Sequence, residues 1–215
     1  NLKLHLYTRF IDNVLSILRD VKSYVLPLKK ITSRFESLKS IDQLQSFIQE
    51  RSAHVTQTTL YGYIKTRIGS RYALMFEDET FLKSINIAKW NIYVVAISDL
   101  TLFTFSYLVD QKNLKEIDAE KVYFDILDNE EKNGLDFKII ENAKLEFKQR
   151  LREINWKTYH LEKPFEKSGL ALFKWSPISD ELKKLDKEIV LNSIKLKWNL
   201  VENDFKDLTK NLNFN

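Results

Sequence analysis

The chain has 215 residues, of which 44% are hydrophobic and 13% aromatic, and this composition supports a sizeable core and excludes a disordered chain. It has 4 glycines and 3 prolines, too few for the turns of a β-sandwich or barrel; it has no cysteine for disulfides or thiolate catalysis, and its formal net charge is only +4. We therefore expect one all-α domain over residues 1–215, a helical bundle of five to seven helices.

The first predicted helix covers about residues 2–26 and ends before Pro27. Basic residues outnumber acidic ones up to about residue 40. Apolar side chains recur on one face at spacings of three and four: Tyr7, Phe10, Val14, Leu18, Val21 and Val25. We expect residues 1–38 to form a basic amphipathic arm, which docks on the core, packs separately against a partner, or lies on an anionic membrane surface.

The second predicted helix starts after Ser40, whose side chain can cap it while Gln43 reaches back. Gly69 follows its end, and Gly62 lies inside it, where we expect a close helix crossing. Between residues 51 and 76 there are bases and aromatics but no acid. We expect this basic face to bind a protein partner or, as a weaker alternative, nucleic acid or the ribosome, through Arg51, Lys65, Arg67, Arg71 and Tyr72.

A central apolar helix is predicted over about 79–109, after the acidic start Glu77, Asp78 and Glu79. It is apolar nearly all round, so neighbours or lipid must cover it, and Asp99 near its middle weighs against lipid.

Ser98 and Asp99 are the predicted buried polar residues of this helix, and a buried carboxylate needs a cation or hydrogen-bond donors. Antiparallel packing would let a base between residues 51 and 76 reach Asp99. The alternative to a structural ion pair is a polar pocket formed by Asp99 with His54, Tyr61 or Lys65.

The second half of the chain begins with an acidic excursion over 110–136. A helix capped by Asp136 then runs to near His160, and residues 169–175 are predicted to be an extended connector. A long C-terminal helix over about 177–210 begins with Ser176 as its cap. It carries two apolar stripes, which imply two neighbours.

Motifs for catalysis, phosphate binding and dinucleotide binding are missing from the sequence, and the three histidines are far apart along it. We expect no metal and no cofactor. A Ser-His-Asp site remains conceivable in space, with His54 as its histidine.

Two strings, VTQTTLYGYIKTRIGSRYALMFEDETFLKSINIAKW and KWSPISDELKKLDKEIVLNSIKLKW, resemble a family of alphaproteobacterial all-helical proteins, some of which carry the label "esterase". The resemblance covers most of the chain after about Ser40. It implies a helical fold and an esterase activity, and because the chain lacks a nucleophile elbow it assigns no catalytic residue.

Taken together, these patterns favour a non-catalytic helical interaction or accessory protein, a peripheral subunit of a larger membrane-associated assembly in the cytoplasm. The alternative is an esterase-like small-molecule hydrolase with a pocket near Asp99, His54 and Tyr61.

Overall fold

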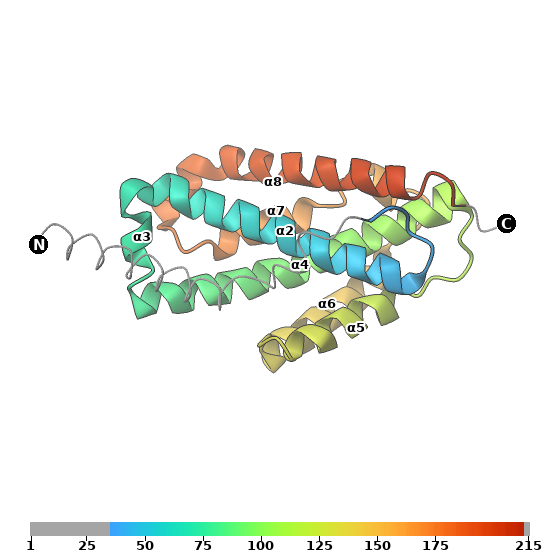
Figure 1. The fold of residues 1–215 in the computed structure, drawn as a ribbon, viewed down its shortest axis with the longest axis horizontal. Coiled ribbons are helices and arrows are strands. Elements are labelled where there is room, and N and C mark those ends of the chain that lie inside the picture. The colour runs from blue at the N-terminus through green and yellow to red at the C-terminus, as the bar shows by residue number, and fades with distance from the viewer. Residues whose placement is uncertain (1–34, 213–215) are drawn as a thin grey trace, which may run out of the picture.

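The computed structural model describes residues 35–212, so most of the expected arm over residues 1–38 lies outside the described residues. Helices lie side by side in the described part, with α8 along one long edge and the α5–α6 pair on the opposite side (Figure 1). The α-helices are α2 (Ile41–Ile68), α3 (Tyr72–Met75), α4 (Glu79–Lys112), α5 (Ala119–Glu131), α6 (Phe137–Glu153), α7 (Glu166–Trp175) and α8 (Asp180–Leu208). Two 3₁₀ turns, η2 (Gly69–Arg71) and η3 (Tyr159–Leu161), complete the order.

The predicted all-α bundle is confirmed, and no strand occurs between residues 35 and 212. The central apolar helix and the long C-terminal helix are both present, as α4 and α8.

Helix α2 begins as its sequence indicates. The Ser40 hydroxyl accepts the N–H of Gln43 at 3.2 Å. The Gln43 side chain accepts the N–H of Lys39 at 2.7 Å, one residue earlier than in the usual reciprocal cap. At its other end, Gly69 has a φ of 62°, which suits glycine past a helix end.

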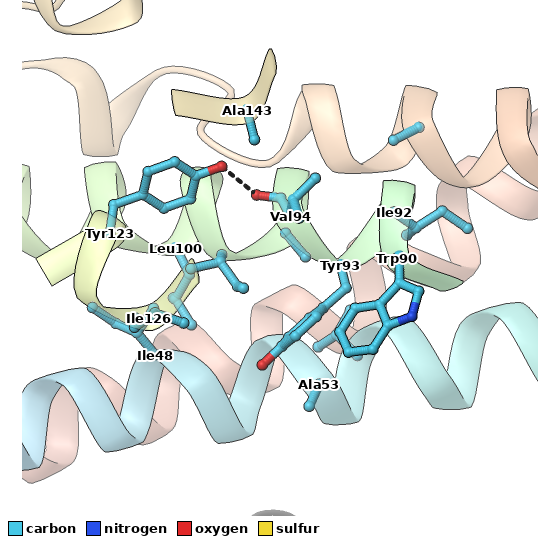
Figure 2. Packing of buried hydrophobic residues seen from close by; sticks show 14 of the residues in the cluster. Ile48, Ala53, Trp90, Ile92, Tyr93, Val94, Leu100, Tyr123, Ile126 and Ala143 are labelled. Carbon is cyan, nitrogen blue, oxygen red and sulfur yellow. Dashed lines mark hydrogen bonds between the residues drawn. The ribbon is translucent and has the colours of Figure 1, made fainter. Parts of the chain in front are cut away.

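Helix α4 is the centre of the core. The Asp78 carboxylate caps its first turn by accepting from Thr80 and Phe81, and Asn113 ends it in the left-handed conformation. It packs mainly on α2 and α7. Tyr93 and Trp90 project toward α2, and the Tyr123 hydroxyl from α5 donates to the Val94 carbonyl at 3.0 Å (Figure 2).

Helix α4 is long and apolar enough to cross a membrane, and 83% of its most apolar window is buried inside the fold. Such burial is also typical of the core helix of a globular bundle. In this bundle the neighbouring helices cover the apolar surface of α4.

The acidic segment 110–136 is not an excursion as a whole, because it contains the packed helix α5. The buried face of α5 includes Val122, Tyr123 and Ile126. Tyr123 stacks on Phe147 of α6, with ring centroids 4.1 Å apart. Most acids of α5 therefore lie on the outer face of a packed amphipathic helix, and Glu130 is the buried exception.

Residues 169–175 belong to helix α7, so the prediction of an extended connector is wrong. The run is short and apolar, and such runs do not distinguish a buried helix from a strand. The close glycine contact also lies here, since a Cβ on Gly169 would be 3.2 Å from Leu191 Cδ2 of α8. Gly62 has no atom within 4 Å of that position, so the predicted close crossing at Gly62 is wrong.

Helix α8 begins at Asp180, a few residues after the predicted start. Ser176 instead ends α7, where its hydroxyl donates to the Leu172 carbonyl at 2.6 Å. The inner face of α8 packs on α2 and α7 through Val190, Ile194, Trp198, Val201 and Phe205.

Candidate functional site

Asp99 is completely buried in an ion pair with Arg150 of α6. Arg150 Nη2 lies 2.7 Å from Asp99 Oδ1, and the Ser168 N–H of α7 donates to Asp99 Oδ2 at 2.7 Å. Burial raises the pKa of the Asp99 carboxyl, and Arg150 and the Ser168 N–H oppose that rise. Asp99 thus fastens α6 and α7 to the central helix.

Arg150 uses the rest of its guanidinium in the same network. Nη1 donates to the Ser98 hydroxyl at 2.6 Å, and Nη2 donates to the Tyr159 hydroxyl at 2.6 Å. Tyr159 in turn donates to the Pro164 carbonyl at 3.1 Å. Both predicted buried polar residues, Ser98 and Asp99, are therefore held by one arginine.

The expectation that the cation for Asp99 comes from residues 51–76 is wrong. Helix α2 packs beside α4, but Arg51 and Arg67 of α2 pair with acids of α8, and the cation comes from α6. A signal for it exists in the sequence, since Arg150 lies between Phe147 and Ile154 at spacings of three and four, on the apolar face of its helix.

His54 and Tyr61 lie away from the Asp99 network. Burial lowers the pKa of His54, and Lys197 of α8 and Arg51 lower it further. Tyr61 stacks on Phe76, with ring centroids 6.4 Å apart. The described structure therefore does not assemble the expected pocket from these two residues and Asp99.

A surface cavity of about 590 Å³ reaches the outer side of the Arg150 network. Arg150 and Tyr159 line it, and its rim mixes acids and bases such as Glu162 and Lys167. Asp99 does not line it. Both terminal nitrogens of Arg150 already have partners inside the fold.

A serine, a histidine and an aspartate do come together, but with His160 and not with His54. Ser106 Oγ lies 3.1 Å from His160 Nδ1, and His160 Nε2 lies 3.6 Å from Asp110 Oδ2. Ser106 also donates to the Trp156 carbonyl at 2.8 Å and accepts the His160 N–H at 3.0 Å. The single hydroxyl proton of Ser106 is donated to the Trp156 carbonyl, and the serine is fully buried. In this arrangement Ser106 and His160 join η3 to α4, and the serine does not present a nucleophile.

A second buried polar group joins α2, α4 and α5 around Glu130. Tyr93 donates to Glu130 Oε1 at 2.9 Å, and Asn133 donates to its Oε2 at 2.7 Å. Nearby, Lys89 is buried against the ring of Trp90. Burial lowers the pKa of Lys89 to about 8, which Glu130 partly opposes.

The predicted basic face is partly used within the molecule. Arg51 pairs with Asp204 of α8 at 2.8 Å, and Arg67 forms two hydrogen bonds with Asp186 of α8. Lys65 and Arg71 are exposed, while the Tyr72 side chain lies outside the described residues. Two of the five predicted contact residues therefore fasten α2 to α8.

The outer face of α8 carries a row of exposed large apolar side chains, which we call the α8 stripe. Its members and exposed fractions are Leu182 (39%), Leu185 (77%), Ile189 (71%), Leu196 (65%) and Leu200 (65%). This is the outer of the two apolar stripes in the sequence of α8. We expected two neighbouring helices to cover both stripes, but the neighbours α2 and α7 pack only on the inner stripe. Contiguous exposed apolar surface is uncommon on monomeric proteins and marks interaction sites.

Neither the family models, the curated proteins nor the solved structures include a match to this chain. Within residues 35–212, no group of three or more histidine, aspartate or glutamate residues is arranged to hold a metal ion.

Proposed function

We propose that this chain is a non-catalytic helical interaction protein, which acts as an accessory subunit by binding a protein through the α8 stripe. The observation that carries the proposal is the stripe itself, five large apolar side chains in one row on a helix that is otherwise well packed. Burying them would remove a large apolar area from water, which is the main driving force for association.

The polar groups inside the fold support the same proposal. Asp99, Ser106 and Glu130 each have hydrogen-bond partners that join helices. Polar groups with such partners hold the helices of a scaffold together. The exposed bases Lys65 and Arg71 form a second, polar contact region for the same assembly, at a membrane surface or on an acidic partner.

The test is a native pull-down from gently solubilised cells of the source organism, followed by mass spectrometry. The wild-type chain is compared with Leu196→Glu, which places a charge in the α8 stripe. Leu145→Glu is the matched control, because Leu145 on α6 is exposed to a similar extent, 70%. A defined partner should be recovered with wild type and Leu145→Glu and lost with Leu196→Glu; equal recovery with all three would contradict the proposal.

Esterase activity is the second candidate, and the observation that favours it is the proximity of Ser106 to His160. It requires a motion that exposes Ser106. Turnover of short-chain esters that persists in both Ser106→Ala and His160→Gln would exclude Ser106 and His160 as its site, and the absence of turnover by wild type would remove this candidate.

A further inference from the structure

The α8 stripe forms one narrow seam. Its members follow one another at spacings of three, four, seven and four residues, so on a helix they fall within about 60° of arc. From Leu182 to Leu200 the seam is about 27 Å long at 1.5 Å per residue. The spacing of three and four is the pattern by which two helices pack along a common seam.

We propose that the α8 stripe binds the α8 stripe of a second copy of this chain, in an antiparallel pair whose twofold axis passes near Leu191 and Asn192. This inference rests on the proposed function, because it names the partner of the same surface. A twofold contact requires a surface that is complementary to itself.

The seam is close to symmetric about its centre, which suits an antiparallel pair. Two leucines lie toward each end, and Ile189 with the polar residues Asn192 and Ser193 lies nearer the middle. When one helix is reversed against the other, Leu185 of one copy packs between Leu196 and Leu200 of the second copy, and this contact occurs twice. A polar residue in such a seam sets the register of the pair at some cost in stability.

The charges beside the seam favour the same orientation. Glu188 and Lys195 are both exposed on one flank. In the antiparallel pair Glu188 of each copy faces Lys195 of the second copy, which gives two opposite-charge contacts. In a parallel pair these residues would face Ser193 and Leu200, so no charge would be matched.

One flanking pair is less favourable, since Glu181 falls opposite Glu202 of the second copy. The carboxylate of Glu202 already has a cation within its own chain, because Lys206 Nζ lies 3.8 Å away. Burial also raises the pKa of the Glu202 carboxyl, and Lys206 opposes that rise.

The exposed area indicates how strong the association should be. At about 100 Å² per fully exposed leucine, the seam offers roughly 300 Å² of apolar surface per copy. With the polar flanks the contact lies at the low end of specific interfaces, below about 1,200 Å² in total. We therefore expect an exchanging dimer with a dissociation constant on the order of micromolar.

The test uses the fact that the chain contains no cysteine, so an introduced thiol can pair only with itself in a second copy. Ser193→Cys lies close to the proposed axis and should give a disulfide-linked dimer under mild oxidation. Leu200→Cys is the matched control, because the antiparallel pair places the two copies of residue 200 about 26 Å apart along the helix axis. Dimer formation by Ser193→Cys alone supports the proposal.

Sedimentation equilibrium of the full chain measures the same association without crosslinking. Leu185→Glu should weaken dimerisation at least about tenfold, while Leu145→Glu should leave it unchanged. Equally fast crosslinking of Leu200→Cys would show a parallel pair and overturn the inference. A wild-type chain that is monomeric at about 100 micromolar would also overturn it. If the pull-down then recovers a different protein with wild type and loses it with Leu196→Glu, the proposed function stands without this inference.

Discussion

Replacement of Arg150 by methionine should destabilise the fold more than any other single change in the Asp99 network. The substitution removes the cation 2.7 Å from Asp99 and the donors to Ser98 and Tyr159. Asp99 then keeps the Ser168 N–H as its donor, in a site with no exposure. Breaking a buried ion pair by removing one partner costs about 3–5 kcal/mol, and we expect this cost for Arg150→Met.

Asp99→Asn should be milder, about 1–3 kcal/mol, because Arg150 keeps Ser98 and Tyr159 and borders the surface cavity. The double variant should lose clearly less than the sum of the two single losses. Urea unfolding followed by far-UV circular dichroism measures all three.

The pH dependence gives a further check on Arg150→Met. Without its cation, Asp99 should have a folded-state pKa raised further above the usual 3.8. The additional loss of unfolding free energy in Arg150→Met should therefore be absent below about pH 3.8 and should grow as the pH rises through the higher folded-state pKa. A loss below about 1 kcal/mol for Arg150→Met at neutral pH, or additive losses in the double variant, would refute the ion-pair account.

Three further predictions concern stability. Gly62→Ala should raise the free energy of unfolding by about 0.5–1 kcal/mol, because the space around its Cβ position is open. Gly169→Val should lower the free energy of unfolding by about 1–3 kcal/mol, because the added side chain would press on Leu191. Urea unfolding measures both, and the opposite order of stability would contradict the packing. Burial lowers the pKa of His160 from 6.5, so its contribution to stability is complete above about 6.5 and is lost as the pH falls through the folded-state pKa; the stability difference between wild type and His160→Gln should shrink over that range, and a constant difference would exclude the effect. The pKa of Lys89 is lowered from 10.5 to about 8, so stability should rise between about pH 8 and 10.5 in wild type and less in Lys89→Met; parallel profiles would place the cause elsewhere.

Features set by neighbouring residues were predictable from the sequence. The cap at Ser40, the glycine end at Gly69 and the acidic start around Asp78 all depend on side chains within a few residues of the backbone they bind. The apolar character of α4 likewise predicted a buried central helix.

Features set by contacts between distant residues were not predictable in the same way. The partner of Asp99 is 51 residues away on another helix, and the choice between Arg150 and a base of α2 depends on how the helices pack. The pairing of Ser106 with His160 and the close approach at Gly169 have the same origin. For α7 the sequence is ambiguous, because a short apolar run fits a strand or a buried helix.

The outer stripe of α8 lies between these cases. Its periodicity is present in the sequence, and an apolar stripe on a bundle helix predicts that another helix of the same bundle covers it. The described structure leaves it exposed, which turns a packing feature into a candidate contact surface.

The most direct test of that central claim is thiol labelling of single-cysteine variants inside the cells that make the protein. Leu196→Cys lies in the α8 stripe, and Lys184→Cys is an exposed control on the same helix outside the stripe. We predict that position 196 is labelled much more slowly than position 184 in cells, and that the two rates converge once the purified protein is diluted. Equal labelling of both positions in cells would show that nothing covers the stripe and would contradict the account.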